Sequence, residues 1–482
     1  MLDHVLIWVN GRRREVRGRE AFLSLSDYLR RVMGLVGTKI VCSEGDCGAC
    51  SVLIGRLAAD GGHLVYRPVD SCIQFLFQLD GTHIVTIEGL GGEQNPSSVQ
   101  QAMIEHHGSQ CGYCTPGFVV AMTGLLEERE QLDEPAMRCG LTGNLCRCTG
   151  YSPIFESGRH IDVAQHERVE QRFPSAAFIA EINQRRELPI DVRAEWDGET
   201  HSFTSPPNLE GALKALDANP KATIVAGATD IGVRINKSLT VPAAILDLNR
   251  VGELAAIDRE NDTLVLGSRT SWTAIEEICC DLAPEFHKIV KVFGAPQIRH
   301  VGTIGGNIAN ASPIADSLPF LHVMEAVLEL VSTAGKREVN INNFYQGYKK
   351  FDLRPGELIA RVRVPLPADE ELLKLYKISR RRDLDIASFT AGIRLQLNGD
   401  SIANAAIAFG AVGPIVIRAR KTEAFLRGQP FTEDTMRTAG DVAVSEVTPI
   451  SDVRGAADYR YQLTRNILLK FFYETQLSAA IA

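Results

Sequence analysis

Four cysteines near the start of the chain have a spacing that suits metal chemistry: Cys42, Cys47, Cys50 and Cys72. The pattern C-x4-C-x2-C followed by a distant fourth cysteine is typical of proteins that hold one [2Fe-2S] cluster through four thiolates. Gly45 and Gly48 would let the loop bend sharply and turn its N–H groups toward the sulfurs. The alternatives are a zinc site or buried free thiols, but zinc ribbons use paired C-x2-C knuckles and this pattern contains one. We therefore predict a [2Fe-2S] cluster here.

A second set of four cysteines follows: Cys111, Cys114, Cys146 and Cys148. They form a C-x2-C and a C-x-C pair, and four more thiolates can close a second metal site. The spacing by itself does not distinguish iron from zinc. Cys139 lies between the two pairs in a predicted helix, and we interpret it as a packed thiol rather than a competing ligand.

Composition narrows the class of protein. The chain has 482 residues, a hydrophobic content of 45% and a charged content of 23%, as expected of a globular protein with two to four domains. Its net charge of -8 argues against binding to nucleic acid or to an anionic membrane. No apolar run approaches the ~20 residues that span a bilayer, and the N-terminal apolar residues precede the arginines, which is the wrong order for a secretory signal. We expect a cytoplasmic protein with free cysteines, whose partners are small molecules and other proteins.

The elements that would position the first four cysteines form a small α+β module over residues 1–88. Residues 4–9 are rich in strand-forming residues and end at Asn10-Gly11, a strong hairpin-turn signal. Residues 24–35 predict one helix, and further short strands are expected near 51–54, 63–66 and 83–87. A mixed sheet crossed by one helix is the pattern of a ferredoxin-like β-grasp domain.

The rest of the chain divides into four further segments. Residues 89–165 predict a helical domain with helices near 97–107, 116–130, 133–141 and 150–164, and the charge-rich stretch 166–189 reads as a linker. An α+β domain follows over 190–366, with strands expected near 222–226, 245–248 and 264–267. A C-terminal α+β domain over 367–482 has predicted strands at 388–397 and 402–412 and predicted helices at 418–427, 433–444 and 456–477.

Two glycine-rich turns in the second half suit phosphate binding. No G-x-G-x-x-G motif follows a predicted strand, so a Rossmann dinucleotide site is not supported. The turns VAGATD (225–230) and GTIGGN (302–307) instead combine small residues, which expose backbone N–H groups, with polar side chains. Each turn taken alone is equally compatible with an ordinary connection after a strand.

The phrases around the cysteines and the turns resemble one known family. QCGYCTPG (110–117) and GNLCRCTGY (143–151), together with EGDCGAC (44–50), resemble the iron-sulfur portion of the xanthine dehydrogenase/aldehyde oxidase family of molybdenum hydroxylases. VAGATDIGV (225–233) and the segment 293–316 resemble the FAD domain of the same family. The resemblance continues through 375–389 and so covers essentially the whole chain.

The resemblance implies a set of cofactor contacts. FAD would be bound by the following residues: Val225, Ala226, Gly227, Ala228, Thr229, Asp230, Ile231, Phe293, Thr303, Gly306, Asn307, Asp316, Ile359 and Lys377. In this set the first seven would wrap the pyrophosphate, Phe293 would lie near the isoalloxazine ring, and Asp316 would contact the adenosine portion. Thr303 and Asn307 would bind the phosphates, while Ile359 and Lys377 would line the flavin pocket.

Gln110 would face a molybdenum cofactor held by a partner chain, and the plainer interpretation of this residue is a solvated loop amide. The resemblance makes the second set of cysteines a [2Fe-2S] site, next to the molybdenum cofactor. No molybdenum-binding portion follows residue 482, so the chain resembles the small iron-sulfur/FAD subunit of bacterial two-subunit xanthine dehydrogenases. The implied assembly has two small and two large molybdopterin-binding subunits.

The activity implied in this way is electron transfer during purine oxidation. Electrons released when the partner's molybdenum centre hydroxylates hypoxanthine or xanthine would pass through the second and then the first cluster to FAD, and then to NAD. No residue of this chain would be a catalytic acid or base. Arginines 380–382 in the loop 378–386 would either steer the anionic NAD or form a solvated surface run. The alternatives are a subunit that serves an aldehyde or an N-heterocycle hydroxylase, or a non-enzymatic redox sensor.

Overall fold

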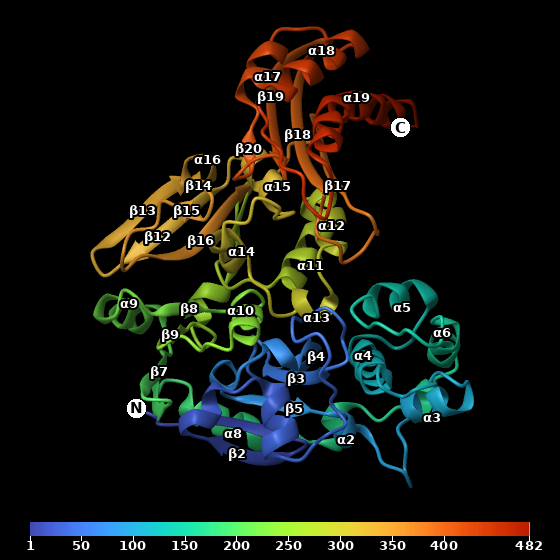
Figure 1. Ribbon diagram of the computed structural model, residues 1–482, viewed down its shortest axis with the longest axis vertical. Coiled ribbons are helices and arrows are strands. Elements are labelled where there is room, and N and C mark those ends of the chain that lie inside the picture. The colour runs from blue at the N-terminus through green and yellow to red at the C-terminus, as the bar shows by residue number, and fades with distance from the viewer. Residues whose placement is uncertain (482) are drawn as a thin grey trace. The chain divides into compact units, whose positions relative to one another are not determined.

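The computed structural model describes residues 1–481, with side chains described up to residue 477, and divides into two compact units. The first unit contains residues 1–253 and 294–302, and the second contains 254–293 and 303 onward. Figure 1 labels the elements of each unit. Each unit is described by itself.

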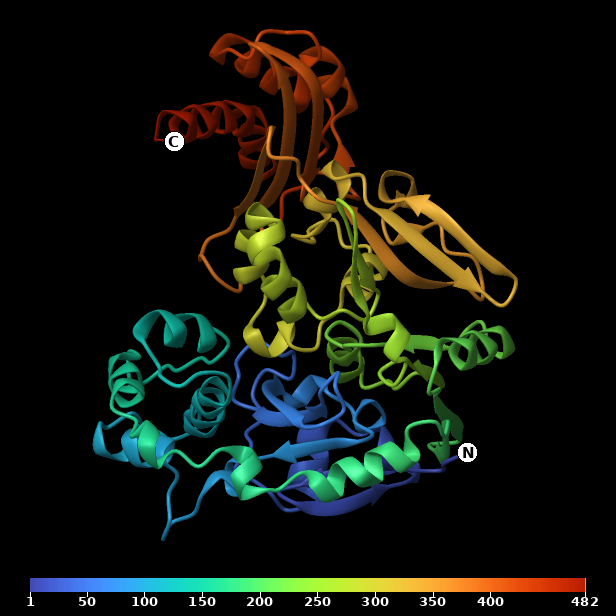
Figure 2. The ribbon, with the colours of Figure 1, turned by 180° about the vertical axis from the view of Figure 1, so that it is seen from behind.

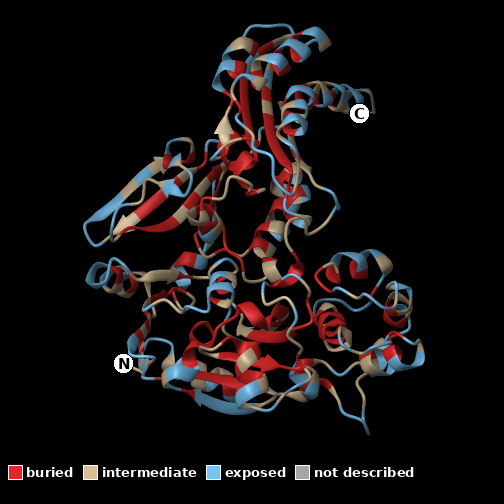
Figure 3. Ribbon diagram, viewed as in Figure 1, coloured by how far each residue is buried: buried red, intermediate tan, exposed pale blue. Residues whose placement is uncertain are grey.

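The first unit opens with a five-stranded mixed sheet in the order β2-β1-β5-β3-β4. Its strands are β1 (Val5–Val9), β2 (Arg12–Val16), β3 (Ser51–Leu57), β4 (Leu64–Asp70) and β5 (Thr82–Val85). Asn10 and Gly11 both have positive φ, as a two-residue hairpin turn requires. The central strands are buried, whereas most of β2 is exposed (Figure 3). This is the β-grasp sheet that the sequence predicts.

The predicted helix at residues 24–35 is shorter and less regular than expected. The Ser24 side chain accepts a hydrogen bond from the N–H of Asp27 and so caps α1 (Leu25–Asp27), which continues as a π-helical turn, η2 (Tyr28–Val32). Three short 3-10 helices complete this part: η1 (Gly18–Phe22), η3 (Ser71–Ile73) and η4 (Leu76–Gln78).

The region after β5 is helical, as predicted. It contains α2 (Ile87–Leu90), α3 (Ser98–Glu105), α4 (Thr115–Glu128), α5 (Glu134–Gly140), α6 (Ser152–Arg159) and η5 (Val163–Gln165). Buried residues of α4, among them Phe118 and Met122, belong to a core shared with one face of the β-grasp sheet. Cys139 lies in α5 as expected, but its side chain is exposed, so the prediction of a packed thiol is wrong. The apolar face of this short helix is instead formed by Ala136 and Met137.

The stretch 166–189, which the sequence predicts as a linker, is folded onto the β-grasp sheet. It contains α7 (Val169–Arg172) and α8 (Ala176–Arg185), and Figure 2 shows α8 lying across the strands of the sheet. Phe178 of α8 is buried, with its ring centroid 5.1 Å from that of Trp8. An ion pair between Arg185 and Asp80 adds a second anchor. Isolated apolar residues in a polar helix supply this packing, which explains why composition suggests a linker.

A four-stranded sheet in the order β6-β7-β9-β8 completes the first unit. Its elements are β6 (Ile190–Trp196), β7 (Glu199–Ser205), α9 (Leu209–Ala218), β8 (Thr223–Val225), α10 (Ile231–Ser238) and β9 (Ala244–Asp247), to which the segment 294–302 adds α13 (Pro296–Arg299). Residues 252–255 form the turn η6 (Gly252–Ala255), where the chain first passes from one unit to the other. Only β8 and β9 match strands that the sequence predicts.

The second unit contains two larger antiparallel sheets and a two-stranded ribbon, β14-β15. The first sheet has the order β10-β11-β16-β12-β13, and its strands are β10 (Ile257–Glu260), β11 (Thr263–Gly267), β12 (Val327–Ser332), β13 (Gly335–Asn340) and β16 (Leu358–Pro365). The same part of the chain contains the helices α11 (Trp272–Leu282), α12 (Pro284–Lys291), α14 (Ile304–Asn310), α15 (Leu318–Val323) and α16 (Ile341–Phe344) and the ribbon strands β14 (Tyr345–Gly347) and β15 (Lys350–Phe351).

The sheet β17-β18-β19-β20 and three helices form the last part of the second unit. They are β17 (Glu371–Ile378), β18 (Phe389–Asn398), β19 (Ser401–Gly410), β20 (Ile417–Arg418), α17 (Arg420–Leu426), α18 (Glu433–Val444) and α19 (Ala457–Ile481). Strands β18 and β19 and the three helices match the predicted elements of the C-terminal region closely, whereas β17 and β20 are not among the predicted strands. None of the helices in the described residues is both long enough and apolar enough to cross a bilayer.

The buried His83 of β5 gives a testable pH dependence. Its Nε2 accepts a hydrogen bond from the N–H of Gly11, and its Nδ1 pairs with the hydroxyl of Tyr66, so the neutral tautomer with a proton on Nδ1 fits. Burial lowers the pKa of His83 to about 4. Because the unfolded side chain titrates near 6.5, the neutral form stabilises the fold above that pH, and this stability is lost as the pH falls toward 4.

We expect acidification from pH 7.5 to pH 5 to lower the free energy of unfolding by about 2 kcal/mol through this histidine. His83→Gln keeps an acceptor for Gly11 but gains no proton in this range. Urea unfolding of both proteins at the two pH values measures the effect, since other acid-sensitive groups are common to both. Equal pH slopes in the two proteins would contradict the assignment.

Candidate iron-sulfur and flavin sites

The first four cysteines converge at one end of the β-grasp sheet. The thiol of Cys42 is hydrogen-bonded to the thiols of Cys47 and Cys72. The thiol of Cys72 is also hydrogen-bonded to that of Cys50. These sulfur contacts lower the pKa of Cys42 and raise that of Cys72. The four sulfurs therefore form a series of neighbouring pairs. No disulfide joins any of them among the described residues.

The loop that carries Cys42, Cys47 and Cys50 has the geometry that the sequence predicts. Gly45 and Gly48 have φ values of +73° and +66°, in the region that favours glycine. The N–H groups that follow Cys42 turn back onto its Sγ, at 3.5 Å from each of the nitrogens of residues 44 and 46. Donors aimed at the sulfur are what a thiolate ligand of iron requires.

The second four cysteines form two separate pairs. Cys111 is hydrogen-bonded through its thiol to Cys148, and Cys114 is hydrogen-bonded to Cys146. Cys114 immediately precedes α4, and the N–H of Cys146 donates to the hydroxyl of Tyr151 at 3.1 Å. The sulfurs of Cys111 and Cys148 belong to exposed residues, whereas the other pair is partly buried.

The arrangement in pairs fits a cluster with two irons better than a single metal ion. A tetrahedral zinc ion would hold all four sulfurs within about 3.8 Å of one another. Within residues 1–481, His106, Glu156 and His160 form the only group of three or more metal-ligating residues with ligand atoms all within 4.8 Å, so neither cysteine set converges on one point. Only His160 of that group is exposed, and the carboxylate of Glu156 is already paired with Arg159 at 2.5 Å. If a [2Fe-2S] cluster is bound, each set would supply two thiolates to each of its two irons.

The predicted pyrophosphate loop lies in the first unit, between β8 and α10. Val225 ends β8, Ile231 begins α10, and Ala228 between them has a φ of +56°. The N–H groups of residues 227–230 have no hydrogen-bond acceptor within the described part of the chain. Successive unpaired N–H groups at a strand-to-helix turn form a concave site for an anion. The loop therefore fits the pyrophosphate of FAD.

Three amide side chains hold this loop by its carbonyl groups. Gln78 and Asn249 donate to the carbonyl of Ala226 at 2.9 and 2.8 Å, and Gln74 donates to that of Gly227 at 3.2 Å. With its carbonyls fixed in this way, the loop keeps its N–H groups available. Sequence reasoning missed both glutamines, although two amides four residues apart in the apolar run CIQFLFQL are a usable signal of buried polar contacts.

The second unit carries the remaining predicted flavin residues. The Thr303 hydroxyl caps α14 by accepting a hydrogen bond from the N–H of Gly306 at 3.1 Å. Asn307, on the same short helix, accepts a hydrogen bond from the Ser317 hydroxyl at 2.6 Å. Phe293 packs edge-on against Trp272. These residues are fixed by the fold, and their contacts with FAD remain a prediction.

Asp316 and Lys377 form a buried ion pair, with 2.8 Å between Lys377 Nζ and Asp316 Oδ2. Lys377 also donates to the carbonyl of Val292 at 3.1 Å. Burial raises the pKa of Asp316, and the neighbouring Lys377 opposes the change. The sequence predicts separate roles for these two residues and gives no sign that they pair. Ile359 is buried in β16, and Gln110, the residue predicted to face a molybdenum cofactor, is exposed.

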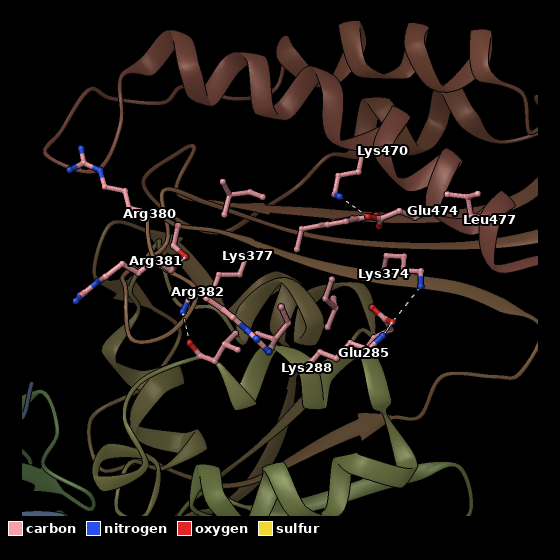
Figure 4. A pocket seen from close by; sticks show the side chains of 16 residues that line it. Glu285, Lys288, Lys374, Lys377, Arg380, Arg381, Arg382, Lys470, Glu474 and Leu477 are labelled. Carbon is pink, nitrogen blue, oxygen red and sulfur yellow. Dashed lines mark hydrogen bonds and ion pairs between the residues drawn. The ribbon is translucent and has the colours of Figure 1, made fainter. Parts of the chain in front are cut away.

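A cationic hollow of about 730 Å³ lies beside Lys377 in the second unit. Its seven cationic lining residues are Lys288, Lys374, Lys377, Arg380, Arg381, Arg382 and Lys470. Figure 4 shows them around the hollow, with Glu285 and Glu474 as the acidic members. Arg382 is exposed and makes no hydrogen bond or ion pair with any other described residue. The hollow therefore has an excess of positive charge that suits an anionic ligand.

Comparison with known proteins identifies the family. Residues 86–159 match the family described as "[2Fe-2S] binding domain", residues 199–367 match "FAD binding domain in molybdopterin dehydrogenase", and residues 374–475 match "CO dehydrogenase flavoprotein C-terminal domain". Xanthine dehydrogenase of Emericella nidulans is 28% identical over 98% of this chain, and xanthine dehydrogenase 1 of Arabidopsis thaliana is 30% identical over 97%. The chain belongs to the molybdenum hydroxylase family.

The chain spans only 38% and 39% of the length of those two relatives. Solved structures similar to it include CO dehydrogenase from Oligotropha carboxidovorans (28% identity, TM-score 0.52, 55% of this chain and 94% of that one) and quinoline 2-oxidoreductase from Pseudomonas putida 86 (27% identity, TM-score 0.53, 57% and 96%). The comparisons confirm the predicted multidomain α+β fold, with a [2Fe-2S] domain and an FAD-binding domain.

Proposed function

We propose that this chain carries electrons from a molybdenum centre on a partner chain, through two [2Fe-2S] clusters, to FAD and then to NAD. The observation that carries the proposal is that each set of four cysteines brings its thiols into hydrogen-bond contact, in loops that touch each other. The N–H of Leu145, next to Cys146, donates to the carbonyl of Cys47 at 3.0 Å. When bound, such clusters carry single electrons and a flavin collects two.

The exposure of the two sets supports a direction for the electrons. Cys111 and Cys148 are exposed, as a set facing a partner chain would be, whereas Cys50 and Cys72 are buried. The first set lies beside α10, the helix that follows the predicted pyrophosphate loop, because Asn236 of α10 donates a hydrogen bond to the carbonyl of Cys72 at 2.8 Å. We therefore place the entry of electrons at the second set and their exit at the first.

Xanthine is the proposed substrate of the complete enzyme, with the purine site on the partner. The similarity to xanthine dehydrogenases over nearly the whole chain supports this proposal. Solved structures named for CO and quinoline are comparably similar, and aldehyde oxidase 1 of Oryctolagus cuniculus is 28% identical over 98% of this chain. Another substrate is therefore the second candidate, and no residue of this chain is assigned to recognise a purine.

The substrate proposal is tested by purifying the chain together with its partner and measuring flavin reduction with xanthine, an aldehyde and quinoline. We expect xanthine to give the highest kcat/KM, with NAD reduced in step with the purine oxidised. A higher kcat/KM with the aldehyde or with quinoline would assign the chain to another hydroxylase. Reduction of the bound FAD by NADH would exclude a redox sensor that lacks a working flavin site.

NAD is the proposed final acceptor, and the cationic hollow beside Lys377 supports it. A dinucleotide carries two negative charges on its pyrophosphate, and Arg382 is an exposed lining cation that has no hydrogen-bond or ion-pair partner among the described residues. We expect Arg382→Ala to raise the KM for NAD about tenfold, which is the loss of one charge-assisted hydrogen bond. Steady-state assays with NAD and with a small dye acceptor provide the measurement.

Turnover with the dye should be unchanged in the Arg382 variant, because the dye needs no phosphate contact. Arg437→Ala is a matched control, since Arg437 is an exposed arginine of α18 outside the hollow. An equal rise in the KM for NAD in both variants would mean that general surface charge, rather than this hollow, attracts the nucleotide.

A further inference from the structure

One short segment of the flavin-domain region is built into the iron-sulfur part of the molecule. Residues 294–302 belong to the first unit, although the chain on either side of them belongs to the second. The segment carries α13, and Gln297 within it has no exposed surface. A buried glutamine needs hydrogen-bond partners, and its partners show what the segment does.

Gln297 forms hydrogen bonds to the loops of both cysteine sets. Its Nε2 donates to Asn144 Oδ1 at 2.8 Å and lies 3.4 Å from the Ser51 hydroxyl. Asn144 in turn donates through Nδ2 to the carbonyl of Gly48 at 3.1 Å. Ser51 and Gly48 flank Cys50 in the first set, and Asn144 lies two residues before Cys146 in the second. One side chain thus links the two metal-binding loops.

The backbones at this junction are too close to admit side chains. A Cβ on Gly48 would lie 2.4 Å from the carbonyl oxygen of Gly143, and a Cβ on Gly117 would lie 2.2 Å from that of Gly48. A Cβ on Gly143 would lie 2.0 Å from Oε1 of Gln297. Three glycines therefore allow the contact, and Gln297 closes it on one side.

We propose that Gln297 is a positioning residue that fixes the separation of the two clusters. The inference deepens the proposed function and rests on it. The glutamine holds Asn144 against Gly48, and this keeps the N–H of Leu145 on the carbonyl of Cys47. The link from Cys47 to Cys146 then consists of covalent bonds and one hydrogen bond. With clusters bound at both sets, this link would carry one electron in each transfer, with no bond broken and no proton moved.

The rest of the segment holds Gln297 in place. Ile298 packs against the buried Cys50, Cys72 and Ile73 of the first set. Arg299, which is buried, donates to the carbonyl of Gly294 at 2.7 Å and closes the segment on itself. Phe293 directly precedes the segment and Thr303 directly follows it, and both are predicted flavin contacts. The flavin-binding region thereby contributes the residue that completes the iron-sulfur junction.

The experiment compares Gln297→Leu with the unchanged protein by electron paramagnetic resonance of the fully reduced, full-length chain. Two reduced clusters close to each other split each other's signals, and the splitting depends steeply on their separation and orientation. We expect the variant to keep about four irons per chain, as two [2Fe-2S] clusters require, and to lose the splitting. Gln101→Leu, at an exposed glutamine of α3, is the matched control and should keep it.

A native splitting in Gln297→Leu with full iron content would overturn the proposal. Loss of iron from the variant would also overturn it, since Gln297 would then serve cluster binding rather than cluster separation. If Gln297→Leu does not fold, Asn144→Leu removes the hydrogen bond between Gln297 and Asn144 from the other side, together with the bond from Asn144 to Gly48, and is expected to lose the splitting in the same way. The measurement uses no purine, NAD or partner, so it is independent of the substrate proposal. Iron missing from the unchanged chain would count against the proposed function instead.

Discussion

Cys146→Ala should leave a chain with about two irons in place of about four, because one pair of the second set loses a thiolate and a [2Fe-2S] cluster needs four. We expect electron delivery from the partner to FAD to slow more than about 100-fold. Changes to residues that only support metal ligands typically cost up to about 100-fold, and loss of a ligand itself should cost more. Reduction of FAD by NADH should be unchanged, since it bypasses both clusters. Iron analysis and stopped-flow flavin absorbance measure the two effects.

The chain supplies its own control for this experiment. Cys139→Ala removes an exposed cysteine of α5 that lies seven residues away from Cys146 and belongs to neither set. Its iron content and its rates should match those of the unchanged protein. Loss of iron from the Cys139 variant together with full iron in the Cys146 variant would mean that the ligand set is wrongly assigned.

Gly227→Ala should release FAD. A Cβ at this position would lie 2.0 Å from the carbonyl oxygen of Val301, so the loop must move away from the backbone that supports it. Overpacking of this kind costs about 1–3 kcal/mol, and the displaced loop no longer presents its N–H groups to a pyrophosphate. We expect FAD per chain to fall by at least about tenfold, which 1.4 kcal/mol of lost binding would produce.

FAD content from absorbance and the thermal unfolding midpoint test the Gly227 prediction. Gly252→Ala is the matched control, because a Cβ on Gly252 would have no atom within 4 Å and its φ is not positive. The iron content should stay unchanged in both variants. A Gly227 variant with native FAD content would show that the loop 225–231 is not the pyrophosphate site.

The spacing of the cysteines and the local signals for turns and helices predict much of the fold. Asn10-Gly11 predicts the first hairpin because a two-residue turn depends only on its own residues. Local signals do not predict that β11, β12 and β16 pair in one sheet, because Thr263 pairs with Pro365, about a hundred residues away. Strand β6 is not among the predicted strands, although its residues IDVRAEW alternate between apolar and polar types and only Arg193 and Glu195 of them are exposed, so this alternation is a usable strand signal.

The candidate site shows the same limit at the level of single side chains. Cysteine ligands are visible in the sequence because their type and spacing define the chemistry. The roles of Gln74 and Gln297 depend on partners more than 150 residues away, Gly227 and Asn144. An isolated glutamine looks like a surface residue until the fold surrounds it. Asp316 and Lys377 pair for the same reason, and no local pattern predicts it.

The path of the chain between the two units has a consequence for how such a protein can be divided. The polypeptide enters the second unit, returns for nine residues that contain α13, and leaves again. No single cut therefore separates an iron-sulfur protein from a flavoprotein. A product ending at residue 253 would lack Gln297, leaving Asn144 without its partner and the apolar side of Ile73 without Ile298. If this chain were divided into two polypeptides at residue 253, the segment 294–302 would have to rejoin the first unit by association for Gln297 and Ile298 to regain their contacts.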